Sequence, residues 1–332
     1  MTADWPETLH EAGLDTRTPT APGVLPESFV APVSDQTLLR IQGPDTRKFL
    51  QGQVTCDINA LSDQQSLAGA ACDPKGRVYA LFQLLSVAED EVLMQLPVAI
   101  VETVMKQMQK YLAFFKAEMT PAPEWFMLGL HGEAAVSTMV GREAAADAPG
   151  QVRPLEEGFA IARMPSPDGA PRHELWLNRL PDLTVDKASA AAWRLSRIGS
   201  GLVALSADTV GGYLPQQLNL HALDGVSFKK GCYTGQEVVA RLHYLGKLKK
   251  SLFRLRIEGT ATDPAPEERI ESPQGKSLGN LVESIMDSDG HCHGLAVLSH
   301  EALNTGLRLA SQPEARVSLE PMGYTVPDQQ PG

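Results

Sequence analysis

Hydrophobic and polar positions follow recognisable periods along much of the chain. Residues 34–43 alternate as in a strand, and the stretch GPDTRKFLQG places Pro44 at a helix start and Gly52 at its end. Between residues 98 and 115, apolar residues recur every three or four positions, namely Val101, Val104, Met105, Met108, Leu112 and Phe115. This spacing predicts an amphipathic helix that packs on a sheet.

The stretch CDPKGRV predicts a hairpin tip. It lies between the apolar runs SLAGAAC and VYALFQLL, and it places Asp73 and Gly76 where a type I turn favours them. Further along, EAAVSTMVG and DKASAAAWRLSRIG have the composition of helices, and HELWL between them reads as a short strand.

The pattern of apolar residues and turn residues changes after Leu245. Short apolar runs such as SLFRLRI, GNLVESIM, HGLAVL and RVSLEP are divided by Gly, Pro and acidic turns, which predicts a small β-barrel over residues 246–326 and a tail over 327–332. Residues 1–30 are rich in Pro, Thr and acidic residues and are expected to form a loose tail. Residues 31–245 would then form the main α+β region.

Composition and charge narrow the class of protein. The formal net charge of -11 argues against a surface that grips nucleic acid everywhere. No stretch has the layout of a secretory signal or the roughly 20 apolar residues that span a bilayer, so we expect a cytoplasmic protein without a membrane partner. The four cysteines form no Cys-x-x-Cys pair, so no stable metal site is expected.

The stretch FKKGCYTGQE carries the candidate chemistry. Cys232 lies between Lys230 and a predicted helix that begins near Gly235. A thiol beside a lysine and near the positive end of a helix is expected to favour its thiolate, which would make Cys232 a nucleophile or a transient metal ligand. The alternative is that Cys232 only fills the core, as many lone cysteines do.

The residues around Cys232 shape this loop. Gly231 and Gly235 permit close approaches, and Thr234 is the expected N-cap of the helix, with Glu237 at the third helical position as in a capping box. Eight basic residues and one acidic residue lie between residues 229 and 256, so an anion would be attracted to this region.

Several motifs resemble one known family. LPQQLNLHALDGVSFKKGCYTGQEVVARL, FLQGQVTCDI and CDPKGRV are similar to those of the YgfZ-type folate-binding proteins, which are relatives of the aminomethyltransferase T-protein of the glycine cleavage system. The octet Lys230 to Glu237 matches the family signature without a substitution. The resemblance implies an α+β fold in which two α/β pieces surround a central channel for tetrahydrofolate or a derivative, followed by a C-terminal β-barrel.

The resemblance also implies site residues. A tryptophan that stacks on the folate maps onto Trp193, and a second one falls on Gln36. In the signature loop and the helix after it, Tyr233, Gln236, Glu237 and Arg241 are the remaining residues expected to contact the folate, with Cys232 and Lys230 as the reactive pair. From the residues alone, the alternative interpretation is that Trp193 packs in the core and does not contact a ligand.

Two departures from the family pattern affect function. The T-protein carries a catalytic aspartate on the strand after the hairpin, whereas this chain has Tyr79 and Ala80 there, so aminomethyl transfer is not expected. Relatives commonly show a glutamate in an EAG triplet that can hydrogen-bond the pterin ring, whereas this chain has Gly199 there, so weaker pterin recognition is expected.

The leading hypothesis is a folate-binding accessory protein that acts in iron–sulfur cluster assembly or repair, including the clusters of tRNA-thiolating enzymes. Its partners would be folate and iron–sulfur proteins or their assembly factors. One alternative is a folate-dependent one-carbon transferase. A second is a tRNA-binding module that uses the basic residues between 229 and 256 and whose affinity falls steeply with salt.

Overall fold

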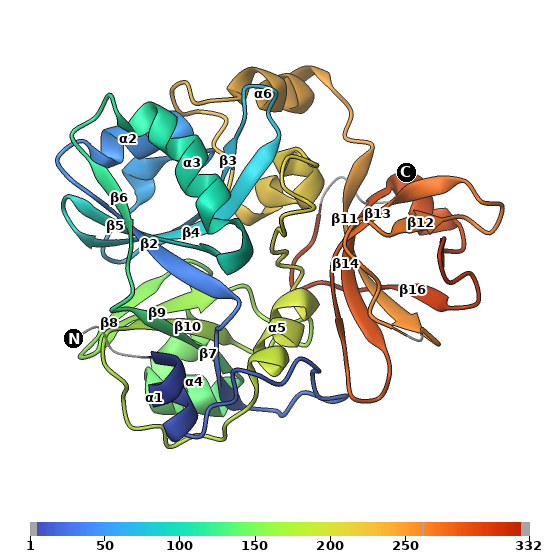
Figure 1. Ribbon diagram of the computed structural model, residues 1–332, viewed down its shortest axis with the longest axis horizontal. Helices are drawn as coiled ribbons and strands as arrows, with labels where there is room; N and C mark the ends of the chain where they lie inside the picture. Colours follow the sequence, from blue (N-terminus) through green and yellow to red (C-terminus); the bar gives the residue numbers. More distant parts are fainter. Residues whose placement is uncertain (1–4, 261, 327–332) are drawn as a thin grey trace.

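The computed structural model describes residues 5–260 and 262–326, and its three sheets form three lobes with α5 (Ala190–Gly199) between them (Figure 1). The sheets have the strand orders β3-β4-β5-β2-β6, β1-β7-β10-β9-β8 and β15-β12-β13-β14-β11-β16. All paired strands in these sheets are antiparallel. The predicted tail over residues 327–332 lies outside the described residues.

The first lobe confirms the strand, helices and hairpin expected near its start. Its strands are β2 (Gln36–Gln42), β3 (Leu67–Cys72), β4 (Val78–Ala88), β5 (Glu91–Pro97) and β6 (Glu118–Pro121). Helices α2 (Thr46–Gln53) and α3 (Val101–Leu112) cover one face of this sheet (Figure 1). The apolar stripe of α3 faces the sheet, and its Val104, Met108 and Leu112 are buried.

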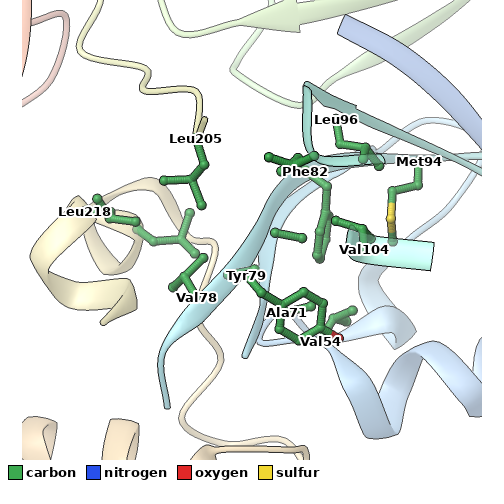
Figure 2. Packing of buried hydrophobic residues seen from close by; sticks show 14 of the residues in the cluster. Val54, Ala71, Val78, Tyr79, Phe82, Met94, Leu96, Val104, Leu205 and Leu218 are labelled. Atoms are coloured by element: carbon green, nitrogen blue, oxygen red, sulfur yellow. The ribbon is translucent and has the colours of Figure 1, made fainter. Parts of the chain in front are cut away.

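The core of this lobe also joins it to the segment after α5. Figure 2 shows Leu205 and Leu218 beside Val78 of β4, and all three are buried. The same cluster includes Phe82 and Val104. Because the β4 side chains alternate between faces, one strand contacts both α3 and the connecting segment.

The second lobe contains the N-terminal residues. Its strands are β1 (Phe29–Pro32), β7 (Phe126–His131), β8 (Val152–Leu155), β9 (Gly158–Arg163) and β10 (Arg172–Leu177), and its helices are α1 (Trp5–Glu11) and α4 (Glu133–Met139).

The expectation of a loose segment over residues 1–30 was wrong for the described part of that segment. The Trp5 and Phe126 ring centroids are 4.1 Å apart, and Leu14 is 1% exposed. Ala21 exchanges main-chain hydrogen bonds with the third sheet, because its N–H donates to Met286 O and its carbonyl accepts from Ser288 N. Apolar side chains spaced among the prolines therefore tie this segment to two lobes.

The third lobe has the short strands that the sequence predicts. They are β11 (Lys250–Glu258), β12 (Arg269–Glu271), β13 (Ser277–Met286), β14 (Cys292–Ser299), β15 (Arg308–Leu309) and β16 (Arg316–Glu320). The sheet curls until its two edges approach each other, where Leu307 and Val317 form a bridge. Helix α6 (Gln236–Leu245) precedes this lobe, and short 3₁₀ helices occupy Ile58–Ala60, Val98–Ile100, Arg142–Ala146, Pro215–Leu218, Leu220–Leu223 and His300–Asn304.

A buried ion cluster fixes α5 against the third lobe. Glu283 on β13 accepts hydrogen bonds from Arg197 Nη2 at 2.7 Å and from Arg194 Nε at 3.0 Å, and a further one from the Ala204 main chain at 2.8 Å. Arg197 also pairs with Asp35 at 3.0 Å, which links the first lobe. Burial alone would raise the pKa of the Glu283 carboxyl, but the two arginines outweigh burial and hold that pKa below its usual value.

We predict that Glu283→Gln lowers the free energy of unfolding at pH 7 by about 3 kcal/mol, because it leaves the buried Arg197 with only the half-exposed Asp35 as an ion-pair partner among the described residues. Since the folded-state pKa of Glu283 is depressed, its contribution is present above the unfolded pKa of about 4.3 and is lost as the pH falls further. Denaturation curves of wild type and variant should therefore converge below about pH 4. The control Glu258→Gln removes the half-exposed partner of Arg256 and should cost under about 1 kcal/mol. Parallel stability profiles for wild type and Glu283→Gln between pH 7 and 3.5 would contradict this role.

Candidate functional site

Cys232 differs from the other cysteines in its exposure. Cys56, Cys72 and Cys292 are buried and Cys232 is exposed, and all four lie in the described part of the chain as free thiols. Burial raises the pKa of Cys56 to about 12 and also raises the pKa values of Cys72 and Cys292. The three buried thiols therefore stay protonated, and Cys232 is the sulfur that solvent and partners can reach.

Lys230 has a different role from the expected one. Its Nζ is buried and donates hydrogen bonds to Val54 O at 2.8 Å and Cys56 O at 2.7 Å, with the Tyr233 ring centroid 5.3 Å away. Burial lowers the pKa of Lys230 to about 8. The ammonium is thus occupied by main-chain carbonyls, so Lys230 anchors the loop to the segment after α2 instead of activating Cys232.

The helix start after Cys232 uses glycine and not the predicted threonine. The N-cap of α6 is Gly235 with a φ of 85°, and no side chain caps the helix. Thr234 instead contacts Gln53, with 3.4 Å between the two side-chain oxygens, and Glu237 is the second helical residue. The expected Thr234 cap and the capping box with Glu237 were therefore wrong, because tertiary contacts turn Thr234 toward α2.

The loop packs on the predicted hairpin tip. Asp73 Oδ1 accepts main-chain hydrogen bonds from Lys75 at 2.8 Å and Arg77 at 2.9 Å, which confirms the turn over residues 73–76. Gly76 has a φ of 74°. A β-carbon added to Gly235 would lie 2.5 Å from the Asp73 carbonyl oxygen, so glycine at 235 allows the two motifs to touch.

Gly231 has no such requirement. A β-carbon at this position would meet no atom within 4 Å, and its φ lies outside the left-handed region. The main chain beside Cys232 therefore borders open space.

A central hollow lies between the first two lobes and the segment after α5. It consists of two adjoining cavities of about 90 and 310 Å³. Both are bounded by Ala68, Gln83, Arg163, Leu202 and Leu223. Leu81, Phe82 and Leu218 add apolar surface to the smaller cavity. The hollow thus has apolar walls with a few polar groups, as small-molecule sites commonly do.

The polar groups of the hollow come from strand positions that the sequence interpretation missed. Glu174 accepts a hydrogen bond from Gln95 Nε2 at 2.7 Å, and Arg163 Nε lies 3.6 Å from the other carboxylate oxygen. Arg163 Nη1 is buried and has no hydrogen-bond partner among the described residues. The available signal was the placement of Gln83, Gln95 and Glu174 inside apolar strands, since buried polar side chains there need partners.

Of the predicted folate contacts, Gln36 lines this hollow. The cavity linings described for residues 5–260 and 262–326 do not include Tyr233, Gln236, Glu237 or Arg241. Tyr233 is buried under the loop, whereas Glu237 and Arg241 are exposed on α6.

Trp193 packs within the second lobe. Its side chain is 1% exposed, and the Arg172 guanidinium lies 4.2 Å from the centroid of its ring. A β-carbon on Gly129 would come within 2.2 Å of the indole, so this side of the ring is filled by β7. Trp193 therefore offers no open stacking face in this structure, and the packing interpretation fits its environment.

Two further observations limit the chemistry of the site. Tyr79 and Ala80, which stand at the position of the aspartate that the resemblance implies for the T-protein, are core residues of β4, 7% and 0% exposed. Within residues 5–260 and 262–326, no three His, Cys, Asp or Glu side chains are grouped so that they could hold a metal ion.

In the same part of the chain, every helix is too short or too polar to cross a membrane.

Comparison with known proteins gives consistent relatives. Curated proteins named tRNA-modifying protein YgfZ are similar over nearly their whole length: that of Colwellia psychrerythraea is 32% identical over 310 residues, covering 91% of this chain and 95% of the relative. The Vibrio vulnificus protein is 32% identical over 323 residues, covering 92% and 95%, and the Cronobacter sakazakii protein is 28% identical over 326 residues, covering 93% and 97%. No protein-family model matches the chain.

A solved structure confirms the predicted fold. Aminomethyltransferase T of the glycine cleavage system from Bartonella henselae superposes with a TM-score of 0.70 at 15% identity and covers 98% of both chains. The expected α+β aminomethyltransferase-like fold, with a curled C-terminal sheet, is therefore the fold of this chain.

We predict that Gly235→Ala destabilises the protein by about 2 kcal/mol or more, because the new β-carbon would strain a left-handed residue and collide with the Asp73 carbonyl. Urea denaturation followed by tryptophan fluorescence measures this loss. Gly231→Ala, four residues away in open space, is the matched control and should cost no stability. Equal stability of the two variants would show that the contact between loop and hairpin is not constrained as described.

Proposed function

The chain belongs to the family of the tRNA-modifying protein YgfZ, and we propose that it is a folate-binding accessory protein that supports the assembly or repair of iron–sulfur clusters, including those of tRNA-thiolating enzymes. The observation that carries this proposal is the placement of Cys232, an exposed thiol on a loop that buried contacts hold from beneath. A reactive residue held by a rigid scaffold and open to partners is suited to chemistry on a macromolecular substrate.

A single thiolate cannot hold an iron–sulfur cluster alone, since such clusters ordinarily take four ligands. The cluster or its iron and sulfide would therefore be cargo that Cys232 contacts briefly while the partner protein supplies the other ligands. Open space beside Gly231 supports this role, because a partner can approach the main chain next to the sulfur.

The central hollow is the proposed site for tetrahydrofolate or a derivative. Its apolar walls suit a planar pterin, Arg163 Nη1 is a buried donor that lacks a partner among the described residues, and Gln36 and Gln83 supply amide groups. When bound, a reduced folate would supply a carrier of one-carbon units. The residues of this chain would bind and orient it and exclude water from its ring.

The one-carbon transferase alternative is less well supported. Tyr79 and Ala80 place an apolar core, and not a carboxylate, at the point of β4 where the resemblance puts the catalytic aspartate. A bound amine would lack a group that positions it there.

Direct contact with tRNA is a second candidate, favoured by one observation on α6. Exposed Arg241 and Lys229 lie near exposed aromatic rings, since His243 stacks on Phe228 at 3.7 Å and Tyr244 is 64% exposed. Such a combination suits unpaired bases and phosphates, and it would bring an RNA next to the Cys232 loop.

We predict that Arg163→Gln weakens tetrahydrofolate binding about tenfold or more, because it removes a charged donor from the hollow. Fluorescence titration of the full chain measures the affinity. Arg179→Gln is the matched control in the same lobe, where the arginine is 61% exposed and pairs with Glu156, and it should bind as wild type does. Unchanged affinity in Arg163→Gln would exclude the hollow as the folate site.

We predict that Cys232→Ala fails to rescue a cell that lacks this protein, scored by the activity of a radical iron–sulfur enzyme that thiolates tRNA, although its folate affinity and protein level match wild type. Cys232→Ser should fail as well, because a hydroxyl is a much weaker nucleophile and metal ligand than a cysteine sulfur. Full rescue by the alanine variant would remove Cys232 from the proposed mechanism. If the alanine variant loses both folate binding and rescue, the cysteine acts through the ligand site.

A further inference from the structure

A larger cavity of about 720 Å³ lies where three parts of the chain meet: the N-terminal segment 23–27, the loop 166–171, and the junction of α5 with the curled sheet. It shares no lining residue with the central hollow. Arg254 on β11 and His293 on β14 belong to its wall, as do Ser196 and Gly199 of α5. None of these residues has a part in the function proposed above.

Three polar side chains on the wall have buried atoms without hydrogen-bond partners among the described residues. These atoms are Arg254 Nε, His293 Nδ1 and Ser166 Oγ. His293 and Ser166 are 7% and 8% exposed. Leaving a buried polar group unpaired costs about 1–3 kcal/mol, so three such atoms around one cavity indicate that something within it completes their hydrogen bonds.

Arg254 supplies a positive charge and a donor. The guanidinium donates through Nη1 to Pro321 O at 2.9 Å and forms no ion pair in the part of the chain that the structure describes. Glu320 on β16 lies opposite Arg254 in the sheet, and the C-terminal end of α5 is nearby. The negative charge of both partly compensates the guanidinium, but neither bonds to Arg254 Nε. The wall at this point favours an anionic oxygen.

His293 supplies an acceptor. Its Nε2 lies 2.8 Å from Asp287 Oδ2, so the proton resides on Nε2 and Nδ1 keeps a lone pair that has no partner among the described residues. Burial lowers the pKa of His293 more than Asp287 raises it, which keeps the ring neutral at pH 7. The ligand must therefore carry a hydrogen-bond donor as well as an anionic group.

The sheet register fixes the spacing of these two groups. β11 pairs Arg256 with His293 and Arg254 with Leu295, so Arg254 and His293 project from one face as diagonal neighbours, with about 7–8 Å between their main chains. A small ligand can therefore contact both side chains at once, with its anionic group on Arg254 and its donor on His293. Ser166, with a hydroxyl that can donate or accept, completes the set.

Space and charge at the mouth restrict the ligand further. A β-carbon added to Gly199 would meet only Arg254 Cζ, at 4.0 Å, so glycine leaves the area before the guanidinium open. Glu27, Glu133 and Asp168 are exposed along the lining. These carboxylates repel a polyanion such as RNA and attract an ammonium group.

We propose that this cavity binds a small carboxylate with a donor on the adjacent carbon, an α-amino or α-hydroxy acid, with the carboxylate on Arg254 and Ser166 and the donor on His293. The acidic mouth favours the amino acid. The site is separate from the folate site proposed above and does not depend on it.

Propionate, lactate and alanine test the proposal, because they share one carbon skeleton and differ in carrying a hydrogen, a hydroxyl or an ammonium at the second carbon. Calorimetric titration of the full chain should show alanine binding about tenfold more tightly than propionate, with lactate between them. Lactate binding more tightly than alanine would assign the site to hydroxy acids. No binding of any probe at about 10 mM, or equal binding of all three, would overturn the proposal. Water would then be the hydrogen-bond partner of the unpaired atoms.

Variants assign each contact. Arg254→Gln should weaken all three probes about tenfold, whereas Ser166→Ala should weaken them less, and His293→Leu should reduce alanine to the affinity of propionate. Gly199→Glu places a carboxylate next to Arg254 and should abolish binding of all three probes. This variant keeps the proposal testable if His293→Leu does not fold. Arg269→Gln, on β12 of the same sheet, where the arginine is 59% exposed and pairs with Glu271, is the control and should bind as wild type does. Probe binding unaffected by Arg254→Gln and Gly199→Glu would contradict the assignment, and folate affinity measured in parallel should stay constant in Arg254→Gln.

Discussion

The buried charges around Glu283 hold the molecule in its three-lobed arrangement. Arg197 and Arg194 extend from α5 to this carboxylate in the third lobe, while Asp35 in the first lobe shares Arg197. Because both the central hollow and the larger cavity are bounded by α5, their shapes depend on this one contact. Buried ions of this kind require all of their partners, so the cluster specifies a single position for the helix.

The signature loop follows a similar logic on a smaller scale. Lys230 points inward to the carbonyls of residues 54 and 56, and Gly235 lets the loop touch the hairpin tip at Asp73. These buried contacts restrain the conformation of the loop and leave Cys232 exposed to solvent. The chain therefore presents one accessible sulfur at a defined place, while burial keeps its other thiols protonated.

The two cavities have different chemical character. The central hollow combines apolar walls with amides and two arginines, Arg163 and Arg197, each with a buried nitrogen that has no hydrogen-bond partner among the described residues, which suits a planar heterocycle. The larger cavity sets a cation and a neutral imidazole on one sheet face behind an acidic mouth, which suits a small molecule of mixed charge. If both proposals hold, the protein binds a second small molecule at a site apart from the one proposed for folate.

The sequence by itself determined the local elements of this protein. The stripe of α3, the hairpin at Asp73 and Gly76, and the short strands of the third lobe follow from periods and turn residues that act over a few positions. The motif octet also identified the family, and with it the fold, because it is specific over eight consecutive residues. Cys232 was recognised from the same local signal.

Only the tertiary structure decided what the side chains in these elements contact. Lys230 lies beside Cys232 in sequence, yet carbonyls from residues 54 and 56 draw its ammonium inward. Trp193 is enclosed by Arg172 and Gly129, and the wall of the hollow comes from Gln95, Arg163 and Glu174 on three different strands. Local patterns report on neighbours along the chain, whereas burial and hydrogen bonding depend on residues brought together from far apart, and this is why the contacts of the candidate site residues could not be predicted from the sequence.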